Sequence, residues 1–227
     1  MLSRLSSVIP PSLRILRTMS TAAATQKPFV LYTGKTPNGY QPSILLEELK
    51  AVYGSTIDYE VRKLDFSKTE QKEPWFLKIN PNGRIPALVD HSRGDFKVFE
   101  TAAILLYLEQ HYDPERKFTF DPQSDEYSEM LQWIFFTHGG VAPMMGQGYL
   151  EETKRLFGVL QIRLENRKYL AGAGEGSFSI ADIKAVPWVK MHAYIGIESL
   201  DEWPGVKAWI DRVVARPGVQ AGLQVPQ

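Results

Sequence analysis

Asn80-Pro81-Asn82-Gly83-Arg84-Ile85-Pro86-Ala87-Leu88-Val89-Asp90 contains a tight turn, a proline and an apolar strand in direct succession. The first four residues favour a turn, and the apolar run after Pro86 is typical of a buried strand. Pro86 has no N–H, so we expect either a trans proline at the first strand position or a cis Ile85–Pro86 bond. A cis bond would turn the Ile85 N–H and C=O away from the sheet, where an extended peptide ligand could bind them like an added strand.

Strands and helices alternate before this turn. Residues 29–33 form an apolar, aromatic run that ends at a glycine, as expected of a buried strand. The turn at 36–39 leads into residues 44–52, where apolar side chains recur at helical spacing. Residues 57–66 alternate as a second strand, and residues 74–79 are predicted to form a short helix.

A hairpin and a helix are predicted after the turn. The strand at 87–90 is joined by a turn at 93–95 to a strand at 96–99, and an apolar helix follows from Glu100 to Tyr112. The order strand, helix, strand, helix, strand, strand, helix is that of a thioredoxin-like α/β domain, which we place at 27–112.

The rest of the chain shows only helical periodicity. We therefore predict a polar linker at 113–122 and an all-α domain at 123–227. Ser179-Ile180-Ala181-Asp182 is an S-x-x-D form of the capping box and predicts a helix start at Ser179. The other expected helices are a stripe of Leu131, Ile134, Phe135 and His138 ended by Gly139-Gly140, a long helix at 150–170, and a last helix at 204–214 that stops before Arg216-Pro217.

Composition excludes several classes of function. The 227 residues include 26 Lys and Arg against 26 Asp and Glu, so we expect no nucleic-acid partner. The four His show no metal-ligand spacing and there is no Cys, so we expect no metal site. No apolar run is long enough to suggest a membrane span. Because the chain has no thiol of its own, any thiol chemistry must use a bound small molecule.

Residues 1–26 differ from the rest of the chain. They contain Arg4, Arg14 and Arg17, several Ser and no acidic residue, which is the composition of a mitochondrial transit peptide. A disordered tail is the alternative. Met19 could serve as a second start and give a cytosolic form, so we expect a mitochondrial or cytoplasmic protein.

These motifs together resemble the cytosolic-type glutathione transferases. The resemblance is carried by N-P-N-G-R-I-P-A-L-V-D at 80–90, F-E-T-A-A-I-L-L-Y-L at 99–108 and F-S-I-A-D-I-K-A-V-P-W at 178–188. T-P-N-G at 36–39 is similar to the branch that contains the fungal nitrogen-repression prion protein and the bacterial Nu class. The resemblance implies a thioredoxin-like domain followed by a helical domain, glutathione as cosubstrate, and a homodimer.

One segment departs from this branch. Relatives carry about five further helical turns after the P-x-x-G-Q motif, whereas here Gln147 is followed almost directly by the next matching segment at Glu152. We interpret this as a deletion in the helical domain. It would remove part of the acceptor pocket and puts the predicted dimer in doubt.

The resemblance assigns the ends of glutathione to particular residues. Glu100 and Thr101, at a helix start, would bind the γ-glutamyl end, because backbone N–H groups and the helix dipole favour a carboxylate there. An ordinary N-cap is the alternative for this pair. Ile85, before Pro86, would pair its backbone with the cysteinyl unit, and Gln71 would bind the glycine carboxylate or be merely solvated.

The thiol must be shifted towards the thiolate to react at neutral pH. The resemblance assigns this role to Thr36 and Asn38, whose hydrogen bonds would act together with the helix dipole. The alternatives are a plain turn at these residues, or Tyr32 as the activating group. An apolar acceptor site could be lined by Trp133, Phe136, His138, Met144 and Met145, although aromatic and Met side chains at such spacing are more often core.

The predicted function is an enzyme that uses glutathione thiolate. It would either conjugate glutathione to electrophiles or reduce disulfides and peroxides, the latter with two glutathiones in turn. A non-catalytic module that binds a protein partner and an inactive isoform that lacks a helical segment are the alternatives.

Overall fold

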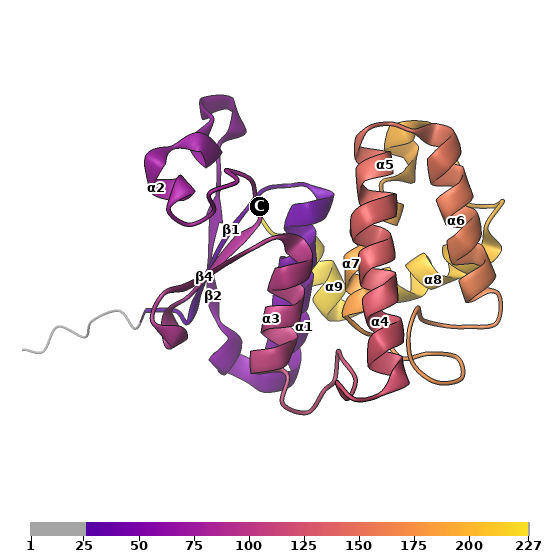
Figure 1. The fold of residues 1–227 in the computed structure, drawn as a ribbon, viewed down its shortest axis with the longest axis horizontal. Coiled ribbons are helices and arrows are strands. Elements are labelled where there is room, and N and C mark those ends of the chain that lie inside the picture. Colours follow the sequence, from indigo (N-terminus) through magenta and orange to yellow (C-terminus); the bar gives the residue numbers. More distant parts are fainter. Residues whose placement is uncertain (1–25, 227) are drawn as a thin grey trace, which may run out of the picture.

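The computed structural model describes residues 26–226. The predicted extension at 1–26 therefore lies, apart from Gln26, outside the described residues. Within them, the thioredoxin-like and helical halves lie side by side, and the C-terminal segment returns from the helical half to the first half (Figure 1). Among these residues, no helix is long and apolar enough to cross a membrane.

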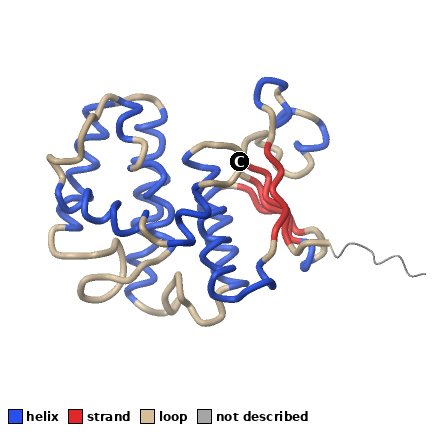
Figure 2. The backbone as a smooth tube through the Cα atoms, turned by 180° about the vertical axis from the view of Figure 1, so that it is seen from behind, coloured by secondary structure: helices blue, strands red, loops and turns tan. Residues whose placement is uncertain are grey.

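The first half contains a four-stranded sheet of order β2-β1-β3-β4 (Figure 2). Its strands are β1 (Phe29–Thr33), β2 (Tyr59–Lys63), β3 (Ala87–Asp90) and β4 (Phe96–Phe99). β1 is parallel to β2 and antiparallel to β3, which pairs with β4 as an antiparallel hairpin. This topology confirms the predicted thioredoxin-like fold.

Side chains of β1 alternate between two apolar layers. Phe29 and Leu31 face α1 (Pro37–Tyr53) and α3 (Thr101–Tyr112), whereas Val30 and Tyr32 face the short α2 (Pro74–Leu77). The period of two along a strand explains why one short segment contributes to both layers. Short 3-10 segments, at 54–57, 66–68, 70–72 and 91–93, connect these elements.

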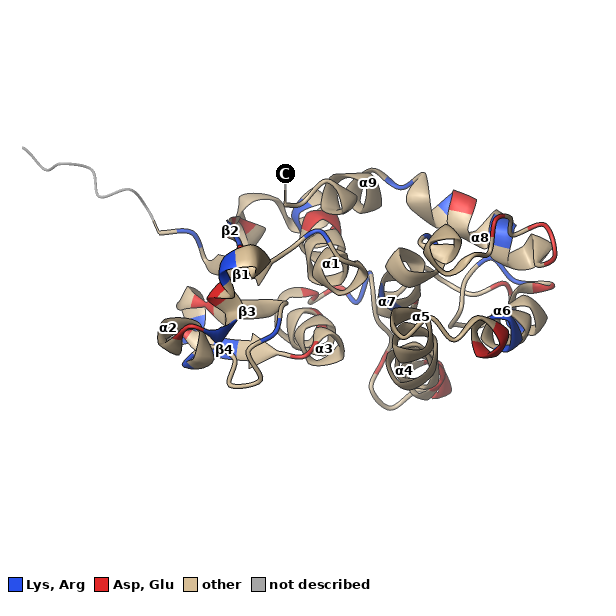
Figure 3. Ribbon diagram, turned by 90° about the horizontal axis from the view of Figure 1, so that it is seen from above, with Lys and Arg blue, Asp and Glu red and all other residues tan. Residues whose placement is uncertain are grey.

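The second half is helical, as predicted. Its helices are α4 (Asp125–Phe136), α5 (Ala142–Gly146), α6 (Leu150–Leu164), α7 (Ile180–Val189), α8 (Pro204–Val214) and α9 (Pro217–Leu223), with a π-helical turn at Thr137–Val141 and a 3-10 segment at His192–Ile195. Lys, Arg, Asp and Glu residues are interspersed over both halves (Figure 3).

Three details of the helical prediction were wrong. Gly139-Gly140 does not end a helix, because both glycines keep helical backbone angles in the π turn that joins α4 to α5. The helix predicted at 150–170 ends at Leu164. Arg216-Pro217 does not end the helical region either, since Pro217 occupies the first turn of α9, where its missing N–H costs nothing.

Phe135 also differs from expectation. The sequence stripe places it on the buried face, but its side chain is 56% exposed, whereas Ile134 and Met130 of the same helix are fully buried. The inward face of α4 is therefore narrower than the stripe that we predicted.

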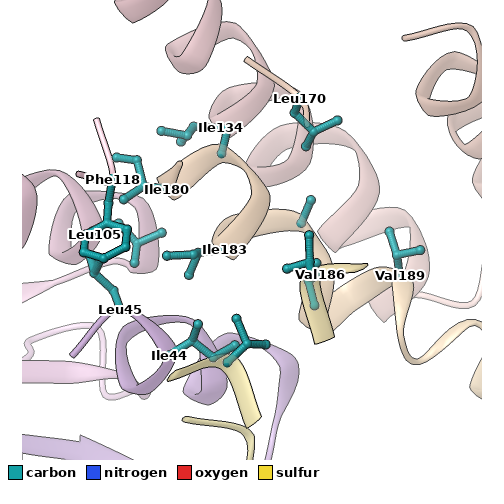
Figure 4. Packing of buried hydrophobic residues seen from close by; sticks show 14 of the residues in the cluster. Ile44, Leu45, Leu105, Phe118, Ile134, Leu170, Ile180, Ile183, Val186 and Val189 are labelled. Carbon is teal, nitrogen blue, oxygen red and sulfur yellow. The ribbon is translucent and has the colours of Figure 1, made fainter. Parts of the chain in front are cut away.

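α7 is the centre of the helical half, and its residues from Ile180 to Pro187 are all buried. The capping box at its start is confirmed, with the Asp182 carboxylate accepting from the Ser179 N–H at 3.0 Å. Figure 4 shows Ile183 and Val186 of α7 among side chains from α1, α3 and α4, so this helix joins the cores of the two halves.

α9 ties the C-terminal segment to α1. Gly222 lies so close to α1 that a Cβ atom there would be 2.3 Å from the Ile44 Cα, and its carbonyl accepts from the Ser43 hydroxyl at 2.8 Å. Arg216 donates two 2.8 Å hydrogen bonds to the buried Glu48 carboxylate. Such a bidentate pair fixes both distance and orientation between the halves.

Candidate active site

A cavity of about 480 Å³ lies between the two halves. It is lined by Asn38, Asn80, Asn82, Arg84, Ile85, Pro86, Glu100 and Thr101 of the first half and by His138, Ala142, Pro143, Gly146, Gln147 and Trp188 of the second. Its size and its largely polar lining suit a small polar ligand. A larger hollow of about 810 Å³ lies beside Tyr40, between α7 and α9, but none of the predicted site residues lines it.

Most of the predicted site residues meet in the interdomain cavity. Its lining contains the predicted Asn38, Ile85, Pro86, Glu100 and Thr101. Thr36 is not among the lining residues, and its hydroxyl accepts from the Gly39 N–H at 3.0 Å as the N-cap of α1. Gln71 is also outside, and its buried Oε1 has no hydrogen-bond partner among the described residues. The roles proposed for these residues stay predictions.

The turn before Pro86 is held by Asn80. Its side-chain amide donates to the Arg84 carbonyl at 2.7 Å and its Oδ1 accepts from the Asn82 N–H at 3.0 Å. The Ile85–Pro86 bond is cis, the second of the two alternatives given above. Ile85, two residues before β3, lines the cavity.

Glu100 is the residue from which α3 starts. Its φ of 70° is uncommon for a residue with a side chain, and such backbone conformations occur preferentially at functional sites. Its carboxylate lies 4.0 Å from the His138 Nε2 and 3.5 Å from the Asn82 Nδ2. The cavity therefore has an acidic group beside the first backbone N–H groups of α3, a pairing that suits a ligand carrying both an ammonium and a carboxylate.

Asn38 lies at the start of α1, at the other end of the cavity. Its Oδ1 accepts from the Gln41 Nε2 and the Trp188 Nε1, each at 3.3 Å. With that oxygen engaged, the amide N–H groups remain as donors, and the positive end of the α1 dipole adds to them. This end of the cavity is therefore suited to stabilising an anion such as a thiolate.

Tyr32, the alternative activating group, points elsewhere. Its ring packs against Trp75 and Phe76 on the α2 face of the sheet, and burial raises the pKa of its hydroxyl. It does not line the cavity. Its position agrees with a packing role.

Comparisons with known proteins show which family the chain belongs to. Residues 27–110 match the family model "Glutathione S-transferase, N-terminal domain", and residues 147–217 match "Glutathione S-transferase, C-terminal domain". The chain belongs to the glutathione transferase family.

Relatives of this transferase also support the predicted branch. It is 37% identical to the disulfide-bond oxidoreductase YfcG of Escherichia coli, covering 85% of this chain and 93% of the relative. It is 30% identical to protein URE2 of Candida albicans, covering 86% and 70%. A crystal structure of a glutathione transferase homolog from Lodderomyces elongisporus, with two glutathiones per subunit, superposes with a TM-score of 0.81 and 36% identity, covering 89% of this chain and all of that one.

The family comparison bears on the predicted deletion. The alignment with YfcG extends over 214 positions, more than the number of residues in 85% of this 227-residue transferase. The relative therefore has residues without a counterpart here. α5 is only five residues long and Gly148 and Tyr149 alone separate Gln147 from α6, which agrees with a loss at this point. Its exact place stays a prediction.

Several residues that line the cavity were not predicted from the sequence. Arg84 brings a cation to the cavity, and its place inside the 80–90 motif was the available signal. Trp188 was quoted only as part of a motif, yet its indole bonds Asn38. His138 lines the cavity as the acceptor hypothesis allows, but Met145 is buried in the core and does not line it. Among the described residues, no cluster of three or more His, Asp or Glu could hold a metal ion.

Proposed function

We propose that this transferase binds glutathione in the interdomain cavity and uses the thiolate of glutathione as its nucleophile. The observation that carries the proposal is the convergence of Asn38, Ile85, Glu100 and Thr101 on one cavity in a chain without Cys. The homolog from Lodderomyces elongisporus, whose structure contains two glutathiones per subunit, supports this cosubstrate.

Glutathione would lie with its γ-glutamyl end at α3. Glu100 faces the ammonium and the N–H groups at the start of α3 bind the carboxylate. The Ile85 backbone pairs with the cysteinyl unit, as an added strand does. Arg84 brings a cation that suits the glycine carboxylate, the role first assigned to Gln71.

We assign thiol activation to Asn38. A donor that bonds the sulfur favours the thiolate over the thiol and so lowers the thiol pKa. The free N–H groups of the Asn38 amide and the start of α1 meet this requirement. Thr36 would act indirectly, since its hydroxyl caps the same helix.

Of the two reactions, we favour disulfide reduction over conjugation to electrophiles. The first glutathione thiolate attacks one sulfur of the disulfide, forming a mixed disulfide and expelling a thiolate. A second glutathione thiolate then attacks the mixed disulfide, which yields oxidised glutathione and the second thiol product. The similarity to YfcG, a disulfide-bond oxidoreductase, supports this choice.

Two assays test the proposal. Calorimetric titration with reduced glutathione should show binding, and a small organic disulfide should be reduced faster than an aryl halide is conjugated. Faster conjugation would reverse the choice of reaction. Binding without either turnover would favour the non-catalytic module or the inactive isoform.

We also propose a homodimer. β4 is an edge strand of the sheet, and its Phe96 and Phe99 are 52% and 37% exposed, while Phe135 on α4 is 56% exposed. Large exposed aromatic side chains are typical of a contact surface. Sedimentation should give a dimer mass, and Phe96→Lys should shift the protein towards monomers, whereas a monomeric wild-type protein would contradict the proposal.

For localisation, we propose import into mitochondria when translation starts at Met1 and a cytosolic form when it starts at Met19. The basic composition of residues 1–26 supports this. Fusions of each form to a fluorescent protein should separate the two locations, and identical distributions would argue against it.

A further inference from the structure

Lys184 is fully buried in the middle of α7. Its neighbours Ile183, Ala185 and Val186 are also fully buried, so this lysine lies inside the core that joins the two halves. Burying an ammonium is costly unless polar partners replace its water. Among the described residues, no carboxylate forms an ion pair with it.

The partners of Lys184 belong to the first half. Its Nζ donates to the Gln41 Oε1 at 2.9 Å and to the Thr101 Oγ1. Gln41 is a fully buried residue of α1, and Thr101 is the first residue of α3, 4% exposed. Lys184 itself does not line the cavity. Thr101 does, and Gln41 is connected to the cavity through its hydrogen bond to Asn38.

We propose that Lys184 is a positioning residue that orients the polar groups at both ends of the cavity, so that each end presents a hydrogen-bond donor to glutathione. The inference rests on the function proposed above. When Lys184 is protonated, as we expect with glutathione bound, its ammonium has three N–H donors and no acceptor, so every atom that it bonds must accept. This determines which atoms of Gln41 and of Thr101 remain free to donate a hydrogen bond.

At the thiol end, the orientation passes through Gln41. Because its Oε1 accepts from Lys184, its Nε2 must donate, and it does so to the Pro37 carbonyl at 3.2 Å and the Asn38 Oδ1 at 3.3 Å. The indole of Trp188 has only a donor and bonds the same Oδ1. The Asn38 amide is thereby held with Nδ2 as its free group, which is the donor that a thiolate needs.

At the carboxylate end, the orientation passes through the Thr101 hydroxyl. A hydroxyl has one O–H donor and accepts through its lone pairs. Since its oxygen accepts from Lys184, its hydrogen is directed away from the lysine and is free for a ligand. The γ-glutamyl carboxylate placed at this helix start would accept it.

A negatively charged ligand should favour the protonated form of Lys184, which is the form that orients Gln41 and Thr101. Two titratable groups interact electrostatically with Lys184. The charge of Glu100, at the start of α3, raises the pKa of Lys184, and the charge of Lys184 lowers the pKa of His138 on the π turn. Burial lowers the pKa of Lys184 to about 7, and the Glu100 charge opposes that shift. A ligand carboxylate beside Thr101 would add negative charge near Nζ and would therefore favour the protonated lysine.

The substitution Lys184→Met tests the orientation. Replacing a buried charge by an apolar side chain of similar length often leaves stability unchanged or raised. We expect the melting temperature to be retained, while the pKa of the bound glutathione thiol, followed by thiolate absorbance against pH, rises by about one unit and the Kd rises about tenfold. Lys190→Met, an exposed lysine on the same stretch of chain, is the matched control and should change neither.

A second substitution separates the two ends. Gln41→Leu should raise the thiol pKa as Lys184→Met does, and the double variant should show no further rise, because both changes interrupt one path. A purely structural role would lower the melting temperature of Lys184→Met and leave the thiol pKa unchanged. That result, or an unchanged thiol pKa with an unchanged Kd, would overturn the inference.

Proton uptake on binding gives a second readout. S-hexylglutathione has no ionisable thiol, so its calorimetric titration in buffers of different ionisation enthalpy reports the protein groups and the α-amino group of the ligand, and the same titration of Lys184→Met measures the part that is not due to Lys184. We expect net uptake of a large part of one proton at about pH 8 and little at about pH 6, since Lys184 becomes charged on binding. His138→Gln should keep this uptake. Binding without uptake at pH 8 overturns the inference alone, whereas no binding of any glutathione overturns the proposed function as well.

Discussion

The two ends of the cavity are held in different ways. At the γ-glutamyl end, Glu100 and Thr101 follow directly on the β3–β4 hairpin, so neighbouring backbone places them. At the thiol end, Asn38 is oriented by Gln41, three positions away, and by Trp188, which lies 150 positions further along the chain. The backbone of the first half therefore places the γ-glutamyl end, although Lys184 of α7 bonds its Thr101 hydroxyl, whereas activation of the thiol depends more strongly on how the two halves pack.

The helical half shows a similar contrast within itself. α7 is buried along almost its whole length, but Phe135, Tyr149 and Ile162 on and between α4 and α6 are 56%, 57% and 77% exposed. Of these, Tyr149 lies three residues after the short α5, where the deletion is predicted. This contrast predicts that the inner face of the helical half is intact and that its outer face is open.

Loss of Asp182 should destabilise the buried inner face of the helical half more than any other change that we propose. Its buried carboxylate accepts from the Trp209 Nε1 at 2.8 Å, the Ser179 N–H at 3.0 Å and the Leu170 N–H at 3.1 Å. Asp182→Ala leaves these donors unpaired, and we expect a loss of about 3 kcal/mol or more in the free energy of unfolding. Urea denaturation measures it. Asp201→Ala, at an exposed position, is the control, and equal stability of the two variants would contradict this role of Asp182.

The free energy of unfolding, measured against pH, should reveal the contribution of Lys184. Its pKa is lowered by burial to about 7 in the folded state, below the value of an unfolded lysine. Above pH 7 the unfolded chain therefore binds more protons than the folded one, so the free energy of unfolding rises with pH. Between pH 7 and pH 9 this contribution is about 2 kcal/mol, and Lys184→Met should lack it. Parallel urea curves of the two proteins across this range would show that Lys184 titrates normally.

The substitution Glu100→Ala tests the γ-glutamyl end of the cavity. The ammonium of glutathione loses its partner, and we expect binding to weaken by about 2 kcal/mol, or roughly 30-fold in Kd. Calorimetric titration measures the change, with Glu165→Ala, at an exposed position at the end of α6, as the control. The thiol pKa should stay unchanged. An unaltered Kd would remove the γ-glutamyl end from this site.

The smallest expected effect is at the thiol end. Asn38→Ala removes one donor to the sulfur, and the pKa of the bound thiol should rise by about one unit. Tyr32→Phe should barely change it, because Tyr32 packs on the far face of the sheet. Thiolate absorbance against pH measures both. The opposite pattern would assign the transferase to the type that activates glutathione with a tyrosine.

Part of the site was predictable because its residues are neighbours in the chain. The turn at 80–90 and the start of the helix at Thr101 depend on backbone preferences and on hydrogen bonds between residues a few positions apart. Asn38 and the N-cap Thr36 are likewise four or fewer residues from the start of α1. The exit of α4 was not predictable, because glycines permit a helix to end but do not require it.

Local periodicity and short motifs were enough to predict the thioredoxin-like order, the all-α second half, the capping box of α7 and the family. Only the packing of distant segments shows the partners of Lys184 and Trp188, the return of α9 onto α1 and the position of Gln71 outside the cavity lining. A lysine on a helix normally reaches solvent, and only the packing of α7 between α1 and α3 buries this one. Contacts between distant segments leave no period in the sequence, so the orientation of the Asn38 amide could not be inferred without the fold.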